Sequence, residues 1–414
     1  MFDRSYSGVS MTWPTSLSDI QPYLADGIGI PQGRLLRCFH PAVTAHIPDI
    51  LALRQRVFKR DAPGGKPSWD DARYWHWKYV AQPRTATAPL PYWVFEKEGE
   101  IIGGMGLQHV QVDVHGKTYP AIWGCDIVVH PSYDTRGLGV FMNLVFQETF
   151  PFFLVLGTNA RSTHMLAGLS HRLPSLRSYK KLIRTGPALE HRLGSRVLEK
   201  ACAVVLDPLY ALYDRSHRVQ IPPGLTFERI EKSDPRIPAL CEQIAPHTRV
   251  RVRRSTEMLA WRFFDNPRWH YECHGALFEH TLCGYVITRT DGKGGAAIGM
   301  IVDWLCGIPT RNPPRSGAAG EAPGPLDEEA TPALAYLHAL LFQYGVGRLA
   351  AQGVSTVYSH ACGRVAEAAL KRLGFIRDAA ADSPFFVESC PREIEADVLS
   401  APNWTLTHGD SDID

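Results

Sequence analysis

A short aromatic motif occurs twice in this chain of 414 residues, and this repeat constrains the fold more than any other feature. Residues 77–83 read Trp-Lys-Tyr-Val-Ala-Gln-Pro, and residues 261–267, which lie 184 positions later, read Trp-Arg-Phe-Phe-Asp-Asn-Pro. Both copies hold an aromatic residue, a cation, an aromatic residue and a proline four positions further on. A repeat on this scale indicates that one structural unit is used twice. We therefore predict two tandem units, residues 34–186 and 224–392.

Hydrophobic patterning within the predicted units alternates between strands and helices. In the first unit, residues 35–40 are predicted as a strand, residues 47–58 as a helix, and residues 92–97 and 100–112 as a hairpin around Gly99. The second unit repeats the same order of elements. This alternation of strands and helices predicts an α/β fold for each unit.

Three segments lie outside the predicted units. Residues 1–33 show no periodicity and are expected to form a loosely packed N-terminal arm, with a lid over a site as the alternative. Residues 187–223 are expected to be a linker, and residues 393–414 a C-terminal tail.

Composition excludes several classes of function. The net charge of +2 gives no general reason to expect DNA or membrane binding. The sequence has no apolar run near the roughly 18 residues of a spanning helix and no signal-peptide layout, so we expect a cytoplasmic protein. Nine cysteines without a Cys-x-x-Cys pair argue against a disulfide framework or a zinc ribbon. The group His270, Cys273, His274, His280 and Cys283 fits no zinc-finger spacing, so no metal is predicted.

Residues 121–148 combine an apolar strand, a tight turn with Gly137 and Gly139, and an amphipathic helix. Glycines allow consecutive backbone N–H groups to turn toward one point, and the N-terminus of the helix adds partial positive charge. This arrangement predicts an anion site that can hold a pyrophosphate without a metal. The glycine spacing matches neither the P-loop nor the dinucleotide-binding fingerprint.

The glycine turn resembles the acetyl-CoA-binding motif of the GNAT superfamily of N-acetyltransferases. Residues 134–139 fill the six places of the pattern Gln/Arg-x-x-Gly-x-Gly/Ala, and the preceding run from Val128 to Pro131 agrees with the family. Asp134 departs from the pattern, because the first place usually holds Gln or Arg. The resemblance implies two tandem GNAT-like units, each with a central mixed sheet flanked by helices. It also implies acetyl-CoA, or another acyl-CoA, as co-substrate. It assigns the cofactor contacts to Ile127, Val128, Val129, Thr135, Arg136, Gly137, Leu138, Gly139, Val140, Asn159 and Ser162.

One residue of the cofactor assignment has an alternative role. Asn159 follows a short apolar strand, residues 152–156, that splays from the central strand in GNAT proteins, and a plain helix N-cap is the alternative role of Asn159.

The second unit has no glycine turn against a helix start. Residues 307–332 there are rich in Pro, Gly, Ala and acids and are predicted as a flexible insertion. We therefore expect one cofactor site, in the N-terminal unit.

Acyl transfer from a thioester to an amine needs a neutral amine, a polarised carbonyl and a proton for the departing thiolate. The resemblance implies that a backbone N–H within residues 127–129 holds the thioester carbonyl. Asp126 is the candidate base, because burial in an apolar strand would raise its pKa. A structural acid paired with an arginine or a backbone amide is the alternative. Leu166 stands where the family often has a tyrosine acid, which leaves His164, His171 and Tyr179 as substitutes.

A dense basic run covers residues 249–254. Its alternatives are a solvated surface and recognition of an anionic acceptor, such as a nucleotide-linked sugar or a phosphorylated carrier. On the second interpretation Arg251 and Arg254 bind the acceptor, together with Asp303, which falls near the place of Asp126 in the repeat. Asp303 also has a structural alternative.

The leading hypothesis is an acyl-CoA-dependent N-acyltransferase that acts on a small-molecule or sugar amine. Tandem units of this type resemble GNAT-type proteins of bacterial polysaccharide and secondary-metabolite pathways. One alternative is a transferase similar to the Fem family, which takes its acyl group from aminoacyl-tRNA. Another is a non-catalytic acyl-CoA-binding scaffold. The three hypotheses differ in whether CoA binds and whether it is turned over.

Overall fold

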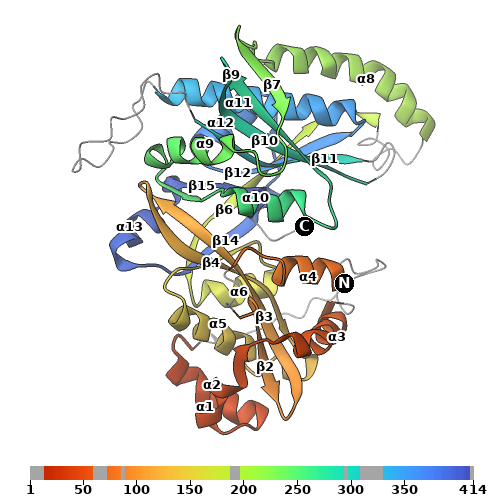
Figure 1. Ribbon diagram of the computed structural model, residues 1–414. Coiled ribbons are helices and arrows are strands. Elements are labelled where there is room, and N and C mark those ends of the chain that lie inside the picture. Colours follow the sequence, from red (N-terminus) through yellow and green to blue (C-terminus); the bar gives the residue numbers. More distant parts are fainter. Residues whose placement is uncertain are drawn as a thin grey trace, which may run out of the picture.

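The computed structural model of the chain describes residues 14–58, 72–84, 89–186, 196–292, 297–307 and 330–410. These residues form two lobes, which are stacked one above the other in Figure 1. The helices are α1 (Leu17–Ile28), α2 (Leu35–Cys38), α3 (Ile47–Phe58), α4 (Ala72–Tyr79), α5 (Leu138–Thr149), α6 (Ala160–Ala167), α8 (Arg196–His217), α9 (Arg236–Ile244), α10 (Thr256–Leu259), α11 (Ala330–Ala351), α12 (Arg364–Arg372) and α13 (Glu395–Val398). The strands are β1 (Phe39–Pro41), β2 (Tyr92–Lys97), β3 (Glu100–Val114), β4 (Lys117–Val129), β5 (Phe153–Leu156), β6 (His171–Leu182), β7 (Leu225–Arg229), β8 (Val250–Val252), β9 (Tyr271–Phe278), β10 (Thr281–Asp291), β11 (Ile298–Cys306), β12 (Thr356–Cys362), β13 (Ile376–Arg377), β14 (Ser383–Ser389) and β15 (Trp404–Thr407).

In the lower lobe, β1 to β4 form an antiparallel run and β5 joins β4 in parallel. Helices α1 and α5 cover one face of this sheet and share its core with Phe95, Met105 and Ile122. Helices α3 and α4 cover the other face, which contributes Val94 and Cys125. The predicted helix at 47–58 and the hairpin around Gly99 are confirmed by α3, β2 and β3.

The upper lobe repeats this arrangement. Strands β7, β9, β10 and β11 are antiparallel neighbours, and β12 joins β11 in parallel. Helix α11 crosses from β11 to β12 as α5 crosses from β4 to β5, and packs on one face with α12. Helix α9 covers the other face with Leu259 and Phe263. The α/β fold with mixed sheets and two units is therefore as predicted.

The two copies of the aromatic motif meet in space. The rings of Trp77 and Trp261 stack with their centroids 5.2 Å apart. The indole N–H of Trp77 donates to the carbonyl of Trp261 at 2.8 Å, and the indole N–H of Trp261 donates to the carbonyl of Trp77 at 2.9 Å. Reciprocal contacts between equivalent residues are the signature of an approximate two-fold relation between the lobes. The internal repeat is thus also a contact between the two units.

Replacing Trp77 with phenylalanine is expected to lower the free energy of unfolding by about 1–3 kcal/mol, because the carbonyl of Trp261 loses its buried donor. Urea unfolding of Trp77→Phe, Trp261→Phe and the double variant measures the coupling between the two residues. Effects that simply add in the double variant would contradict a direct contact between them.

The lobes also exchange strands. Strand β14, near the C-terminus, pairs with β5 of the lower lobe, whereas the second half of β6 pairs with β12 of the upper lobe. Strand β14 of the second unit therefore lies next to the parallel pair β4–β5 of the first unit. Strand β6 of the first unit lies next to the parallel pair β11–β12 of the second unit. Strands β6, β14, β5, β4, β3, β8, β15 and β12 close into a ring around a shared hydrophobic core.

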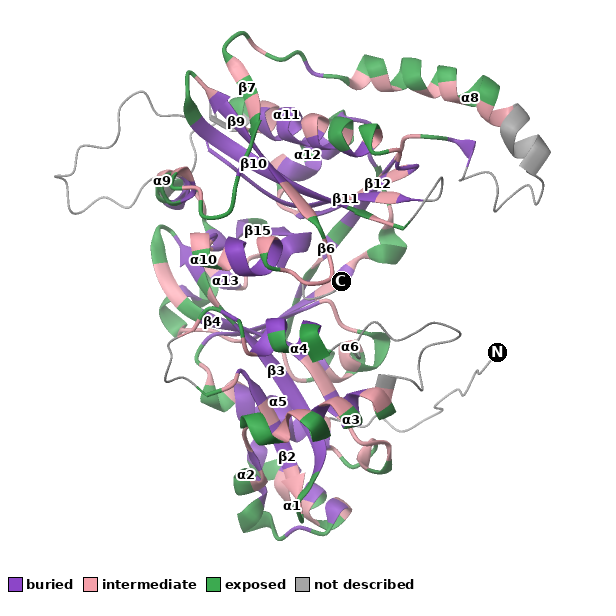
Figure 2. Ribbon diagram, turned by 45° about the vertical axis from the view of Figure 1, so that its right-hand side comes forward, coloured by how far each residue is buried: buried purple, intermediate pink, exposed green. Residues whose placement is uncertain are grey.

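Several predictions, one at the start of the first unit and others for the flanking segments, are wrong within the described residues. Residues 35–38 form helix α2 rather than a strand, and only Phe39–Pro41 is extended. The predicted loose arm contains α1, whose apolar side packs on α5 (Figure 2). The predicted tail folds as α13, β15 and a 3₁₀ turn at His408–Asp410, and the last two of these are largely buried.

The predicted linker contains the 22-residue helix α8, which lies along the outside of the upper lobe (Figure 1). Most of the predicted insertion at 307–332 lies outside the described residues. Its last residues, from Ala330, begin α11. No helix in the described parts of the chain is long and apolar enough to cross a membrane.

Candidate active site

The parallel strands β4 and β5 separate within the lower lobe. They pair only where Ile122 faces Phe153 and Trp123 faces Leu154, although β4 continues to Val129. We call the place where the two strands part the β4–β5 fork. Helix α5 begins beside the end of β4, and α6 follows the end of β5, so both helix starts lie at the fork.

A β-bulge interrupts β4 at the fork. Cys125 pairs with Gly106 and Val128 with Gly104, so two residues of β4 face one residue of β3. Asp126 takes a positive φ of 52° there. Beyond the bulge, the N–H of His130 bonds to Ile102 of β3 at 2.8 Å. Antiparallel ladders alternate, so the N–H groups of Val129 and Ile127 are directed away from β3, toward the fork.

The glycine turn lies at the mouth of the fork. A 3₁₀ turn at Pro131–Tyr133 leads to Gly137, which has φ +80° and ends the loop before α5. Among the described residues, no acceptor is bonded to the N–H groups of Leu138, Gly139 and Val140, as expected for the first turn of a helix. These amides and the helix dipole make the loop a site for an anion.

Gly139 forms part of the wall of the fork. A Cβ atom added at Gly139 would lie 3.6 Å from the sulfur of Met165, 3.7 Å from Ile127 and 3.9 Å from Val129. These are ordinary van der Waals distances, so the position has room for a methyl group. By contrast, a Cβ atom at Gly137 would lie 2.9 Å from Ile20 of α1. The two glycines thus face different surroundings, the fork and helix α1.

The acid at the first place of the motif is paired with an arginine. Asp134 accepts a hydrogen bond and ion pair from Arg161, the second residue of α6. The same guanidinium donates to the backbone carbonyl of Asp134 at 2.6 Å. The negative charge of the loop is therefore compensated from across the fork.

Asn159 and Ser162 hold the start of α6. The side-chain oxygen of Asn159 accepts a hydrogen bond from the N–H of Ser162 at 2.9 Å, which makes Asn159 the N-cap of the helix. The alternative role of Asn159 as a helix cap is therefore observed.

Asp126 is held by cations on the face of β4 that α3 and α4 cover. Its carboxylate lies 3.0 Å from Arg54 and 3.1 Å from Lys78, and it accepts a hydrogen bond from the hydroxyl of Tyr79. The side chain is 9% exposed. Burial pushes the pKa of Asp126 upward, but the positive charges outweigh it and hold the pKa well below its usual range. The expectation that burial would raise this pKa is therefore wrong.

The two other predicted catalytic residues lie elsewhere. His164 is exposed on α6. Tyr179 is buried in β6, where its hydroxyl donates to Glu367 of α12 at 2.7 Å in the upper lobe. Burial and this hydrogen bond raise the pKa of Tyr179 to about 12. The structure thus places Asp126 and Tyr179 in separate polar groups, in the lower and the upper lobe, and His164 on the exposed side of α6.

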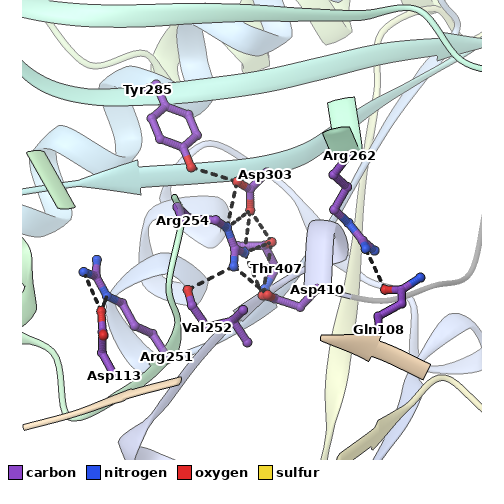
Figure 3. A network of polar contacts seen from close by, with 10 residues as sticks. All are labelled: Gln108, Asp113, Arg251, Val252, Arg254, Arg262, Tyr285, Asp303, Thr407 and Asp410. Atoms are coloured by element: carbon purple, nitrogen blue, oxygen red, sulfur yellow. Dashed lines mark hydrogen bonds and ion pairs between the residues drawn. The ribbon is translucent and has the colours of Figure 1, made fainter. Parts of the chain in front are cut away.

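The three predicted acceptor residues belong to buried ion pairs between the lobes (Figure 3). Arg251 contacts Asp113 at 3.1 Å, and Arg254 contacts Asp303 at 2.8 Å. Arg254 also contacts Asp410 at 2.7 Å. Because Asp303 is buried and paired with Arg254, a structural role is favoured over acceptor binding for Asp303. The burial and the carboxylate partners of Arg251 and Arg254 favour a structural role for these two residues as well.

Within the residues that the structure describes, the upper lobe has no open counterpart of the fork. Strands β11 and β12 pair from Ile298 to Ile301 and then separate. Beyond that point β12 pairs with β15 on the edge that β11 leaves, and Gly409 lies against Asp303. The C-terminal segment therefore occupies the space between the two strands. This adds a steric reason to expect one cofactor site per chain.

Sequence reasoning missed two residues of this region. Arg54 lies in an ordinary amphipathic helix, and nothing in the sequence relates it to Asp126. Arg161 is 27 positions from Asp134, and only folding brings them together. The sequence does mark two other partners of Asp126. Lys78 and Tyr79 both belong to the repeated motif, and both donate to the Asp126 carboxylate.

Comparison with known proteins agrees with this geometry. Residues 39–148, which include β4, the glycine turn and most of α5, match the family model described as an acetyltransferase (GNAT) domain. No protein of curated function matches the chain.

Three solved structures share the fold of the chain. A GCN5-related N-acetyltransferase from Anabaena variabilis ATCC 29413 is 13% identical, with a TM-score of 0.52 over 84% of this chain and 71% of that one. Saccharomyces cerevisiae N-myristoyltransferase, whose structure holds myristoyl-CoA, is 12% identical, with a TM-score of 0.52 over 93% and 86%. A probable N-acyltransferase from Enterococcus faecalis V583 is 12% identical, with a TM-score of 0.50 over 84% and 72%. The chain thus has the fold of these GNAT-type acyltransferases, and its residues 39–148 match an acetyltransferase (GNAT) domain.

Proposed function

We propose that the protein is an acyl-CoA-dependent N-acyltransferase that transfers an acetyl or other acyl group to a small-molecule or sugar amine. The observation that carries this proposal is the fork itself. A glycine turn with free helix amides, a bulged strand with N–H groups directed outward, and the start of α6 converge there. The match of residues 39–148 to the GNAT family supports the same ligand. A cytoplasmic location belongs to this proposal.

In this proposal the loop amides of residues 137–140 bind the pyrophosphate, and the pantetheine arm follows the fork toward β4. The N–H of Val129 or Ile127 polarises the thioester carbonyl, because both are directed into the fork. The bound acyl-CoA supplies the acyl group and the thiolate leaving group. Direct attack by a neutral amine forms the amide bond and breaks the C–S bond, and the proton lost by the amine balances the charge of the thiolate.

In this proposal Asp126 is a positioning residue and does not act as the general base. Its pKa is too low for efficient proton abstraction near neutral pH, and its carboxylate is engaged by Arg54, Lys78 and Tyr79. This group holds α3 and α4 against the bulge of β4. Solvent or the departing thiolate takes the amine proton.

Turnover can be tested by incubating the protein with acetyl-CoA and a panel of primary amines, starting with amino sugars. Mass spectrometry then follows acetylated amine and free CoA, which avoids reagents that react with the nine cysteines. Amine-dependent release of CoA with matching product is expected. Binding of acetyl-CoA without product from any amine would favour the scaffold, and absence of binding would remove the proposal and direct attention to aminoacyl-tRNA.

A further inference from the structure

Arg161 delivers a cation to the glycine turn from a different element. It lies at the start of α6, on the opposite side of the fork from α5, and contacts both the carboxylate and the backbone carbonyl of Asp134. The side chain remains 63% exposed while making these contacts. It is therefore both fixed at the turn and open to solvent.

The ion pair between Arg161 and Asp134 compensates for the acidic residue by which this chain departs from the GNAT pattern. An isolated carboxylate at the first place of the turn would repel a phosphate, because both are negative. Arg161 cancels that charge. A guanidinium has five N–H donors, and Asp134 takes two of them, so donors remain for a ligand. Arginine is also suited to bidentate binding of phosphate oxygens.

We propose that Arg161 is a ligand of the CoA pyrophosphate and that Asp134 positions it. Where the family pattern has Gln or Arg at its first place, this chain has Asp134 and supplies a cation from α6. This inference rests on the proposed function, because it concerns the same cofactor. It adds that α6 takes part in binding phosphate as well as the pantetheine arm.

Calorimetric titration of acetyl-CoA into Arg161→Ala is the first test. Loss of charge-assisted hydrogen bonds is expected to weaken binding on the order of tenfold or more. Because the side chain is exposed, the variant is expected to keep the circular dichroism spectrum and melting temperature of the wild type. Arg215→Ala, at an exposed position of α8, is the matched control and is expected to bind as the wild type does.

A rescue variant distinguishes a ligand from a structural residue. Asp134→Arg returns the cation to the place that the family pattern uses, so Arg161→Ala with Asp134→Arg is expected to recover most of the lost affinity. A structural role for the Arg161 pair predicts no recovery, because the double variant lacks both partners.

Titration of 3′-dephospho-acetyl-CoA assigns the phosphate. An equal loss with both ligands is expected for a pyrophosphate contact, whereas a loss confined to acetyl-CoA would assign Arg161 to the 3′-phosphate and overturn the proposal. Wild-type affinity in Arg161→Ala would also overturn it and leave the proposed function intact. If the wild-type protein does not bind acetyl-CoA, the proposed function itself fails.

Discussion

Replacing Arg254 with methionine is expected to lower the free energy of unfolding by about 3–5 kcal/mol, one of the two largest effects we predict. The guanidinium lies between Asp303 and Asp410, whose side chains have no exposed surface. Tyr285 and Thr407 complete the group (Figure 3). Removing the cation leaves two buried carboxylates without a charged partner. Urea unfolding followed by circular dichroism measures the loss.

Two further variants test this explanation. Arg249→Met changes a neighbouring arginine that bonds to the neutral side chain of Asn403, so an effect below about 1 kcal/mol is expected. Combining Arg254→Met with Asp303→Asn and Asp410→Asn removes the stranded charges and should recover part of the loss. Wild-type stability in Arg254→Met would mean that this cluster does not hold the C-terminal segment between the lobes.

Replacing Asp126 with asparagine is also expected to lower the free energy of unfolding by about 3–5 kcal/mol. The reason is that Arg54 and Lys78 lose their buried counter-charge. The pH dependence has a definite sign. The folded pKa of Asp126 is lowered, so below about pH 4 the unfolded chain binds the extra proton more readily than the folded one. The contribution of Asp126 is complete above the unfolded pKa and is lost as the pH falls through the folded pKa.

Unfolding of the wild type and Asp126→Asn between pH 7 and pH 3 tests this prediction. The difference in stability is expected to be largest at neutral pH and to shrink on acidification. Adding Lys78→Met to Asp126→Asn should restore stability, since one stranded cation is removed. A difference that grows toward low pH would contradict the lowered pKa and reopen the role of Asp126 as a base with a raised one.

Local patterns explain which parts of the fold could be predicted from the sequence. The hairpin around Gly99 and the strand, turn and helix at 117–149 depend on alternation, glycine positions and helical spacing within a few residues. Helix α1 carried a comparable signal, because Ser16 caps it and its buried residues recur at helical spacing. Pro22 and Gly27 within that helix obscured the pattern.

Long-range features could not be predicted in the same way. A strand such as β14 has the same local pattern whether it pairs within its own unit or with β5 of the other. Likewise, the ion pairs of Arg254 join segments that are far apart in sequence, and a basic run gives no indication of burial. The candidate site was predicted where it depends on the local glycine turn. Its electrostatics depend on Arg54 and Arg161, which reach it only through the fold.

The most direct test of the central claim, one acyl-CoA site at the β4–β5 fork, is calorimetric titration of acetyl-CoA into wild type, Gly139→Ala and Gly139→Trp. A methyl group at Gly139 meets only ordinary contacts, whereas an indole there fills the fork. Gly139 is a cleaner probe than Gly137, whose substitution would press on α1. One acetyl-CoA per chain is expected for wild type and Gly139→Ala, with binding abolished in folded Gly139→Trp. Unchanged binding in Gly139→Trp, or two sites per chain, would contradict the account.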